Sequence, residues 1–338
     1  MLRGASLQKK IINIYMSVLV FTENWDGKFK KLSFELASYA SSVAGKLGIT
    51  TTALSIGKVE EDELKKLANF GVSKIIDIRN DKLIRLDNQV YTQVISTVAE
   101  REKATVVVIS NNNTGKAIAP RLSVKLKAGI VSGVTGLPVS LEPMVIRKKV
   151  FSGKAYSLVE IKTPVKILTL SQNSYELVPR DLDSVIESFS PDYDTGVIKT
   201  TVKSVQKQTG KVILTDAEIV VSGGRGMKSP DHWAPLEELA ELLGAGLACS
   251  RPVSDEGWRS HEEHAGQTGK IIAPNLYMAF GISGAIQHLA GVSSSKYIVA
   301  VNTDKDAPIF EAADYGIVGD AHKVLPELIK EIKAAKSS

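Results

Sequence analysis

The sequence predicts an α/β fold of two domains, each with a mainly parallel, Rossmann-like sheet flanked by helices. Three observations favour this class. Candidate strands alternate with candidate helices up to about residue 129 and again from residue 218 onward. Between these regions, β-type segments follow one another without helices, which predicts an antiparallel β extension of the first sheet. The length of 338 residues is comfortable for two domains.

The first alternating region shows the periodicities of both element types. Thr105 to Ile109 is a β-branched run typical of a strand buried on both faces, and apolar residues recur at helical spacing between Phe29 and Leu47. The predicted strands are 17–21, 51–56, 74–78 and 105–109, and the predicted helices are 29–47, 60–70, 88–101 and 114–126. The extension is predicted at 144–170 and 195–205. The first domain therefore spans 16–205 and leads into a linker at 206–217.

The second domain is predicted at 218–335, where strands and helices alternate again. The helix at 233–244 turns its leucines to one face and ends at Gly244. The predicted strands are 218–222, 246–249, 270–273, 297–301 and 316–318, the helices are 233–244, 283–290, 307–314 and 321–335, and a long loop covers 251–269.

The first fifteen residues stand apart from both domains. Lys9 and Lys10 precede an apolar run that ends at Phe21, as in a signal peptide, but no small-residue cleavage site follows. The run is also too short to span a membrane, so direct membrane insertion is not expected. Because Met16 directly precedes the first strand, we expect 1–15 to be a disordered extension or a start-site artefact.

Composition narrows the function classes. The net charge of +5 is small and spread along the chain, without a Lys/Arg block interleaved with aromatics, which argues against nucleic-acid binding. The single cysteine, Cys249, excludes an internal disulfide and favours a reducing compartment such as the cytoplasm. The five histidines show no metal-ligand spacing, so no metal site is predicted.

Three familiar motifs fail when their spacing is tested. The glycines of GGRG at 223–226 do not fit the dinucleotide fingerprint. GQTGK at 266–270 resembles a phosphate loop, but His264 and Ile271 stand where the Walker pattern needs Gly and Ser/Thr. No Ser/His/Asp arrangement stands out, so no catalytic triad is predicted.

Polar residues at the ends of the predicted strands point instead to a long ligand. Arg225, Arg251, Asn302 and Asp320 each follow a strand, and parallel strands bring such residues to one sheet edge. Ser283 and Gly284 are predicted to open a helix whose free N–H groups suit a pyrophosphate. The alternative is that each residue is only a cap or turn former, an explanation that weakens when all of them share one edge.

The histidines have two interpretations. His288 lies in an apolar helix, where a lone histidine is usually a core residue, although Ser283 and Gln287 nearby favour a polar pocket. For His261 and His264, which lie in a loop with two glutamates, solvation is the expected state.

These segments together resemble a known family. The chain reads VVSGGRG at 220–226, SRPVSDEGW at 250–258, GQTGKIIAPNLYMAFGISGAIQHLAG at 266–291 and IVAVNTDKDAPIFEAADYGIVGD at 298–320. In this order they resemble the alpha subunit of electron transfer flavoprotein over nearly all of 218–333. SVLVFTE at 17–23 and TGKAIAPRLSVKLKAG at 114–129 match that family's first domain, which is adenine-nucleotide hydrolase-like, more loosely.

The resemblance implies one FAD in the second domain. The implied contacts are Arg225, Ser250, Arg251, Ala265, Gly266, Gln267, Thr268, Ser283, Gly284, Ala285, Ile286, Gln287, His288, Asn302 and Asp320. It implies that Arg251, Thr268 and His288 tune the flavin's redox behaviour. It places Arg225 and Ser283 at the pyrophosphate, and Asn302 and Asp320 at the adenosine half. The segment 258–265 departs most from the family pattern.

The resemblance also implies partners. The family's beta subunit docks on the first domain to form a heterodimer and carries AMP. Electrons come from flavin dehydrogenases, such as the acyl-CoA dehydrogenases of fatty acid beta-oxidation, and pass to a membrane quinone oxidoreductase. The protein would then be a carrier without its own substrate turnover, in the bacterial cytoplasm or the mitochondrial matrix. The alternatives are an electron-bifurcating subunit, a flavin enzyme with a dissociable substrate, and a nucleotide-binding module without redox work.

Overall fold

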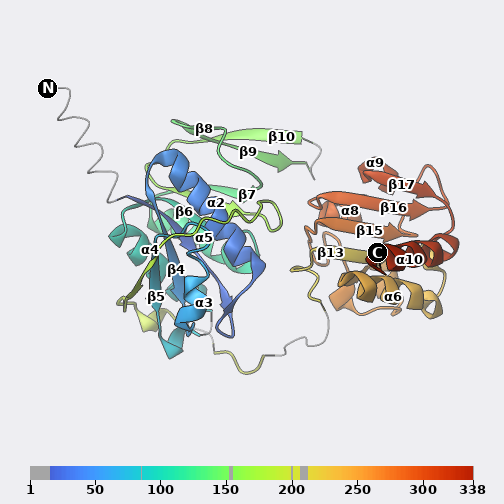
Figure 1. The fold of residues 1–338 in the computed structure, drawn as a ribbon, viewed down its shortest axis with the longest axis horizontal. Coiled ribbons are helices and arrows are strands. Elements are labelled where there is room, and N and C mark those ends of the chain that lie inside the picture. Colours follow the sequence, from blue (N-terminus) through green and yellow to red (C-terminus); the bar gives the residue numbers. More distant parts are fainter. Residues whose placement is uncertain (1–15, 85, 152–154, 199–200, 206–211, 338) are drawn as a thin grey trace. The chain divides into compact units, whose positions relative to one another are not determined.

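The computed structural model describes residues 16–84, 86–151, 155–198, 201–205 and 212–337, and the chain falls into two compact units. The first unit comprises the described chain up to Val150 and from Tyr156 to Val205, and the second comprises Phe151, Ala155 and the described chain from residue 212 onward (Figure 1). The predictions for 1–15 and for 206–211 of the linker lie outside the described residues. Leu214 and Ala217, also assigned to the linker, are buried in the second unit's core.

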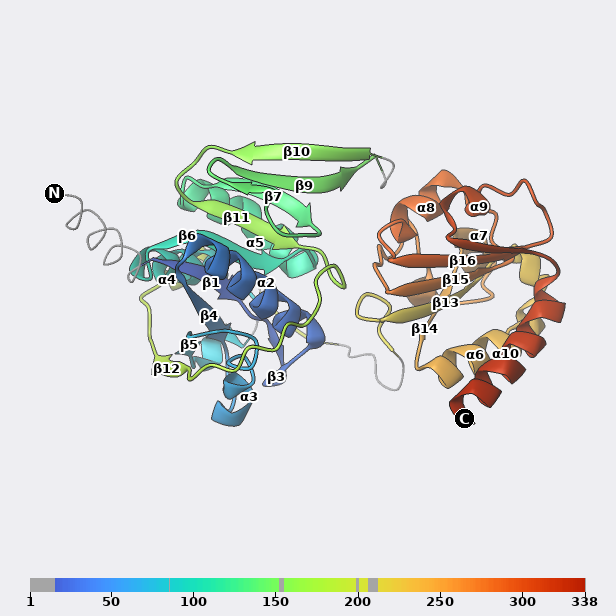
Figure 2. The same ribbon diagram turned by 45° about the horizontal axis from the view of Figure 1, so that its top comes forward.

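A seven-stranded sheet forms the centre of the first unit (Figure 2). Its strands, in spatial order, are β12 (Val185–Ser188), β5 (Lys74–Ile78), β4 (Thr50–Ile56), β1 (Ser17–Phe21), β6 (Ala104–Ser110), β11 (Lys166–Leu170) and β7 (Gly129–Val134). Every neighbouring pair is parallel. Such a sheet must be covered on both faces, which explains the apolar strand sequences.

Helices cover both faces of this sheet. Because side chains alternate along a strand, Val18 and Val20 of β1 contribute to the core beneath α2 (Lys31–Leu47) and α3 (Glu61–Lys65). Leu19 and Phe21 contribute to the opposite core, beneath α4 (Asn88–Arg101) and α5 (Asn113–Lys125). The unit also contains the short strands β2 (Asn24–Trp25) and β3 (Lys28–Phe29) and the 3-10 turns Asp81–Leu83 and Thr195–Val197.

The antiparallel part differs from the sequence-based prediction in detail. β8 (Ser140–Leu141), β9 (Met144–Val150) and β10 (Ala155–Ile161) form their own three-stranded sheet instead of extending the first one. β11 lies between β6 and β7 and is parallel to both. Its apolar side chains are buried on both faces of the sheet, as expected for an inner strand. No strand forms in the described part of 195–205, where Val202 and Val205 are exposed. β12, which pairs with β5, was not predicted.

The second unit contains a five-stranded parallel sheet. Its strands, in spatial order, are β14 (Gly246–Cys249), β13 (Ile219–Gly223), β15 (Leu276–Phe280), β16 (Tyr297–Asn302) and β17 (Tyr315–Val318). The helices α6 (Ala234–Leu243) and α10 (Ala321–Ser337) cover one face, and α8 (Ile286–Val292) and α9 (Ile309–Ala312) cover the other (Figure 2). The remaining helical segments are α7 (Arg251–Asp255) and the 3-10 turns Arg225–Met227, Pro230–His232 and His261–Glu263. The predicted α/β fold class is thus confirmed.

Two predictions for the second unit are wrong. The central strand is β15 at 276–280, not 270–273, and it lies between β13 and β16. Ile271 is 53% exposed, whereas Tyr277 and Phe280 are fully buried, so only the later segment supplies a core strand. The following helix begins at Ile286, not at Ser283. Among the described residues, no helix combines the length and the apolar character needed to cross a membrane.

Candidate functional site

A cavity of about 460 Å³ lies in the second unit, within the size range of small-molecule sites. Loops that follow β13, β14 and β15 form most of its wall together with Asn302 at the end of β16 (Tyr297–Asn302), as expected at the carboxyl edge of a parallel sheet. The lining residues are Arg225, Gly226, Ser250, Arg251, Pro252, His264, Thr268, Gly281, Ile282, Ser283, Gly284, Ala285, Gln287, His288 and Asn302.

The structure brings most of the predicted site residues together at this cavity. Those that line it are Arg225, Ser250, Arg251, Thr268, Ser283, Gly284, Ala285, Gln287, His288 and Asn302. They come from segments up to 77 positions apart in sequence, between Arg225 and Asn302. The convergence shows that the strand-end residues share one site, while their contacts with a cofactor stay a prediction.

Five predicted residues do not line the cavity. Ala265 and Gly266 are buried behind the turn that carries Thr268, and the exposed Gln267 is tied to α8 by a 2.8 Å hydrogen bond from its N–H to the Gln287 carbonyl. The side chain of Ile286 is 72% exposed. Asp320 accepts a 3.0 Å hydrogen bond from the His322 N–H at the start of α10, and this bond is the main cause of its lowered pKa.

Glycine-to-glycine contact shapes the floor of the site. A Cβ atom on Gly226 would lie 2.6 Å from the Gly281 Cα, and one on Gly224 would lie 2.2 Å from the Gly281 carbonyl oxygen. The Gly226 N–H donates to that carbonyl at 3.0 Å. The GGRG segment therefore serves close packing of two loops, which explains why its spacing does not fit the dinucleotide fingerprint.

The Ser283–Gly284 segment differs from the predicted helix cap. Ala285 is the N-cap of α8, and Ser283 makes no capping bond. Gly284 has a φ of +85°, and a Cβ there would lie 2.3 Å from the Ile309 backbone nitrogen. The Ser283 carbonyl accepts from that nitrogen at 3.0 Å, so the loop packs on α9 before the helix starts. Ser283 is exposed, which leaves its hydroxyl accessible at the cavity wall.

Two arginines give the cavity a cationic rim. Arg225 Nη1 lies 3.8 Å from a Glu256 oxygen, and Arg251 Nε lies 3.2 Å from Asp255 Oδ2. The arginine side chains are 65% and 62% exposed, respectively. Exposed pairs of this kind contribute little stability, about 0–1 kcal/mol, so both guanidinium groups can readily exchange these partners for an anionic ligand.

His288 is buried at the base of the cavity. Its Nε2 lies 2.7 Å from the Tyr277 hydroxyl, and its Nδ1 has no hydrogen bond of normal geometry among the described residues. Burial lowers the pKa of His288 to about 4, while the Ala265 backbone acts in the opposite direction and His264 adds to the lowering. The imidazole is therefore neutral near pH 7 and acts as a hydrogen-bonding group.

His264 is a site residue that the sequence did not reveal. The expected solvation of this side chain is wrong, since His264 is 7% exposed and lines the cavity. Its ring packs under the following turn, where a Cβ on Gly269 would lie 2.7 Å from Nδ1. Burial is the main cause of its lowered pKa. His261 is exposed and lies 2.7 Å from the Ser254 hydroxyl.

The other unpredicted lining residues, Gly226, Pro252, Gly281 and Ile282, are close sequence neighbours of predicted ones. Within the described ranges, no group of three His, Cys, Asp or Glu side chains could hold a metal ion. Burial raises the pKa of the Cys249 thiol to about 12, so this cysteine is not a nucleophile at neutral pH.

The residues present fit an extended dinucleotide such as FAD. The arginine rim suits a pyrophosphate, and the glycine floor allows close approach of a ligand to the backbone. Residues at or after the ends of four strands, β13 to β16, line the cavity. The buried Nδ1 of His288 makes no hydrogen bond of normal geometry to the described residues. This wall of the cavity therefore holds a polar atom that the described protein groups do not satisfy with normal geometry.

Comparisons with known proteins agree with this site. Residues 213–293 match the family model described as electron transfer flavoprotein FAD-binding domain. Residues 18–192 match the family model described as electron transfer flavoprotein domain. The first of these ranges contains nearly the whole cavity lining, with Asn302 beyond it.

Individual relatives match over nearly their full length. An electron transfer flavoprotein subunit alpha from Thermoanaerobacterium thermosaccharolyticum is 36% identical over 332 residues, covering 96% of this chain and 100% of the relative. The Bacillus subtilis subunit alpha is 36% identical over 317 residues, covering 94% and 97%. A probable mitochondrial subunit alpha from Caenorhabditis elegans is 34% identical over 313 residues, covering 92% of each. A solved thiamine diphosphate-dependent decarboxylase from Rhodococcus jostii RHA1 is 14% identical with a TM-score of 0.24, covering 93% of this chain and 59% of its own, which supports no inference.

Proposed function

This chain belongs to the electron transfer flavoprotein alpha-subunit family, and from that premise we propose that it holds one FAD in its second unit and relays electrons as half of a heterodimer. The observation that carries the proposal is the convergence of strand-end residues on one cavity inside the matched FAD-binding domain. Membership of this family supports an electron-transfer role rather than turnover of a substrate.

Different residues along the cavity would bind different parts of the FAD. Arg225 and Ser283 are accessible to a pyrophosphate, and Asn302, whose amide donates to the Ile282 carbonyl at 2.9 Å, would face the adenosine half with Asp320 beyond it. Arg251, Thr268 and His288 would surround the flavin end. Bound FAD would supply the acceptance and release of electrons, and the protein supplies binding, orientation and electrostatics.

The partners follow from the family. We propose a beta subunit that carries AMP as the dimer partner, with acyl-CoA dehydrogenases and other flavin dehydrogenases as donors and a membrane quinone oxidoreductase as acceptor. The relatives' names include bacterial and mitochondrial subunits, which supports a bacterial cytoplasm or mitochondrial matrix as the compartment. A bifurcating complex differs from this proposal by a second flavin, which would lie in the beta subunit.

Co-expression with the neighbouring beta subunit is expected to yield a one-to-one complex that is yellow, with one FAD per alpha chain. Flavin absorbance and native mass measure both ratios, and an acyl-CoA dehydrogenase with its substrate should bleach the flavin band. Two flavins per dimer would favour a bifurcating complex. A colourless complex, or an alpha chain that alone holds FAD and accepts electrons, would contradict the proposal.

Arg251→Ala is expected to lower the first reduction potential of the flavin by a few tens of millivolts. A nearby guanidinium stabilises added electron density, and each tenfold change in a one-electron equilibrium is about 59 mV. Arg251→Lys should restore part of the potential, since it returns the charge without the planar group. Asp255→Asn is the matched control, because it removes the partner of Arg251 and keeps the cation. Unchanged potentials in all three variants would make Arg251 a structural residue.

A further inference from the structure

A buried hydrogen bond joins the cavity to the central strand of the second sheet. The Tyr277 hydroxyl of β15 lies 2.7 Å from His288 Nε2 at the start of α8. Tyr277 is fully buried and His288 is 7% exposed, so no solvent competes for this bond. Tyr277 does not line the cavity, whereas His288 does. The tyrosine can therefore act on a ligand only through the histidine.

We propose that Tyr277 is a positioning residue of the FAD site, and that by donating to Nε2 it holds His288 in the neutral tautomer with its proton on Nδ1. The inference rests on the proposed function for the identity of the ligand. The tautomer itself is a property of this chain, set by the donors and acceptors around the imidazole.

The buried hydrogen-bond donor beside His288, the Tyr277 hydroxyl, selects this tautomer. A buried phenol must donate its single proton, and Nε2 is the acceptor that the geometry provides at 2.7 Å. If Nε2 were the donor instead, the phenol proton would need another acceptor. The buried Ser222 hydroxyl is one candidate, but its Oγ makes no hydrogen bond of normal geometry among the described residues.

Two secondary electrostatic effects agree with the same direction of donation. Burial raises the pKa of Tyr277, so the phenol keeps its proton and remains a donor. Burial lowers the pKa of His288, so the imidazole is neutral and one of its nitrogens can accept a hydrogen bond. Since Nε2 accepts from Tyr277, the proton of the neutral imidazole lies on Nδ1.

The helix that carries His288 also contacts the turn that carries two of the predicted FAD ligands. Ala265 leads into the turn with Gln267 and Thr268, and the Gln267 N–H donates to the Gln287 carbonyl of α8 at 2.8 Å. A Cβ on Gly291 would lie 2.4 Å from the Gly266 Cα, so the helix and the turn are in backbone contact. The Tyr277–His288 bond therefore ties β15 to α8, the helix against which this turn packs.

The test is Tyr277→Phe in the co-expressed complex, with nitrogen-labelled histidine. The native complex should show a pyrrole-type Nδ1 and a pyridine-type Nε2 for His288, a signal assigned by its loss in His288→Gln. Tyr277→Phe should remove that preference and weaken FAD binding about threefold to tenfold. Tyr297→Phe is the matched control, since Tyr297 is 48% exposed on the neighbouring strand and should change neither quantity.

A double-mutant cycle separates positioning from simple packing. In the His288→Gln background, Tyr277→Phe should have little further effect on the FAD Kd, because the histidine that it positions is gone. Additive effects would make Tyr277 a packing residue and overturn the inference. A native proton on Nε2 with FAD bound would overturn this inference alone. A native complex without FAD would overturn the proposed function and with it the role of Tyr277 at an FAD site, whereas the tautomer would still be measured on its own.

Discussion

Replacing Gly281 with alanine is expected to destabilise the second unit by about 3 kcal/mol and to abolish stable FAD binding. Gly281 has a φ of +62°, and an added Cβ would lie 2.7 Å from the Gly226 Cα. A left-handed backbone costs an ordinary residue about 1–2 kcal/mol, and forced overpacking adds about 1–3 kcal/mol. The obstructing atom belongs to the backbone, so no side-chain rotation can relieve the contact.

Gly244→Ala is the matched control for this prediction. Gly244 has a φ of +60°, almost the same as Gly281, but a Cβ there meets no atom within 4 Å. Its substitution should therefore cost only the backbone term, about 1–2 kcal/mol, and leave FAD binding intact. Denaturant unfolding and the flavin content of the purified complex measure the two effects. Equal losses in both variants would show that the two loops do not need their close contact.

The part of the fold that was predictable is the part fixed by local patterning. The helix at 88–101 has the predicted bounds because Asp87 caps its first turn, accepting from the Gln89 and Val90 N–H groups at 2.9 and 3.0 Å. The strand at 17–21 was predictable from an apolar run that only a doubly covered strand requires. Helix caps and apolar runs depend only on residues that are close together in the sequence, and they can therefore be recognised from the sequence.

The errors concern choices made by distant residues. Residues 270–280 contain two apolar runs separated by Pro274 and Asn275, and either could form a strand. Pairing decides between them: Leu276 to Phe280 align with β13 on one side and β16 on the other, so the earlier run is left outside the sheet. The prediction that 195–205 belongs to the antiparallel extension failed for the same reason, because the described part of this segment has no neighbouring strand.

At the candidate site, position along the strands was predictable and side-chain environment was not. Arg225 and Arg251 follow β13 and β14 as expected, because a strand end can be recognised locally. The burial of His264 depends on a turn that folds back over its ring, with the Lys270 N–H donating to the His264 carbonyl at 2.8 Å. Nothing in the sequence around His264 distinguishes it from the exposed His261.

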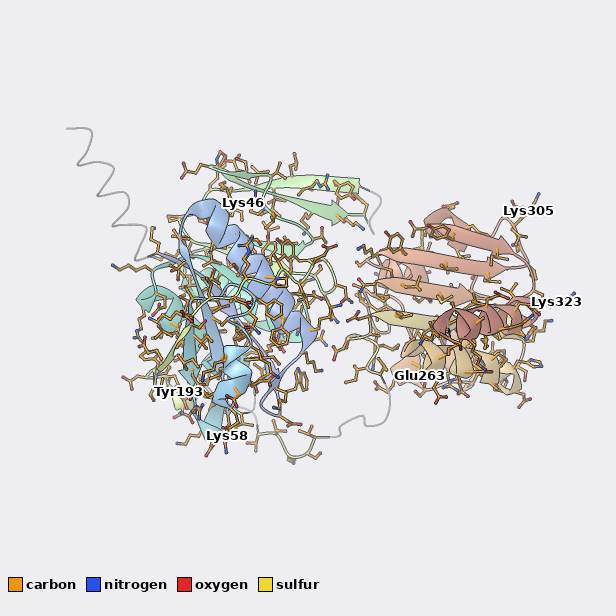
Figure 3. The ribbon with its side chains drawn as sticks, viewed as in Figure 1. Lys46, Lys58, Tyr193, Glu263, Lys305 and Lys323 are labelled. Atoms are coloured by element: carbon orange, nitrogen blue, oxygen red, sulfur yellow. The ribbon has the colours of Figure 1, made fainter. Side chains whose placement is uncertain are left out.

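The segment before that turn is anchored by one arginine. Arg259 donates from Nε to Glu263 Oε2 at 2.5 Å and from Nη2 to Oε1 at 3.1 Å, and its Nη1 reaches Glu237 of α6 at 2.6 Å. The guanidinium also lies 5.1 Å from the ring centroid of Trp233. Glu263 is buried, whereas the Glu237 side chain is 51% exposed (Figure 3 labels Glu263). The Arg259 guanidinium thus pairs with the buried carboxylate of Glu263 and with the exposed carboxylate of Glu237 in α6. These bonds anchor the segment that leads to His264 and Thr268.

Arg259→Met is expected to destabilise the second unit by about 3 kcal/mol, because a buried carboxylate loses a two-bond partner while the apolar stem is kept. Glu237→Gln should cost under about 1 kcal/mol, since the same arginine meets an exposed carboxylate there. Glu263→Gln added to Arg259→Met should recover part of the loss by removing the buried charge. Denaturant unfolding measures all three variants, and FAD affinity should fall only in those that change Arg259. If Arg259→Met and Glu237→Gln cost the same, burial of Glu263 does not determine the strength of this network.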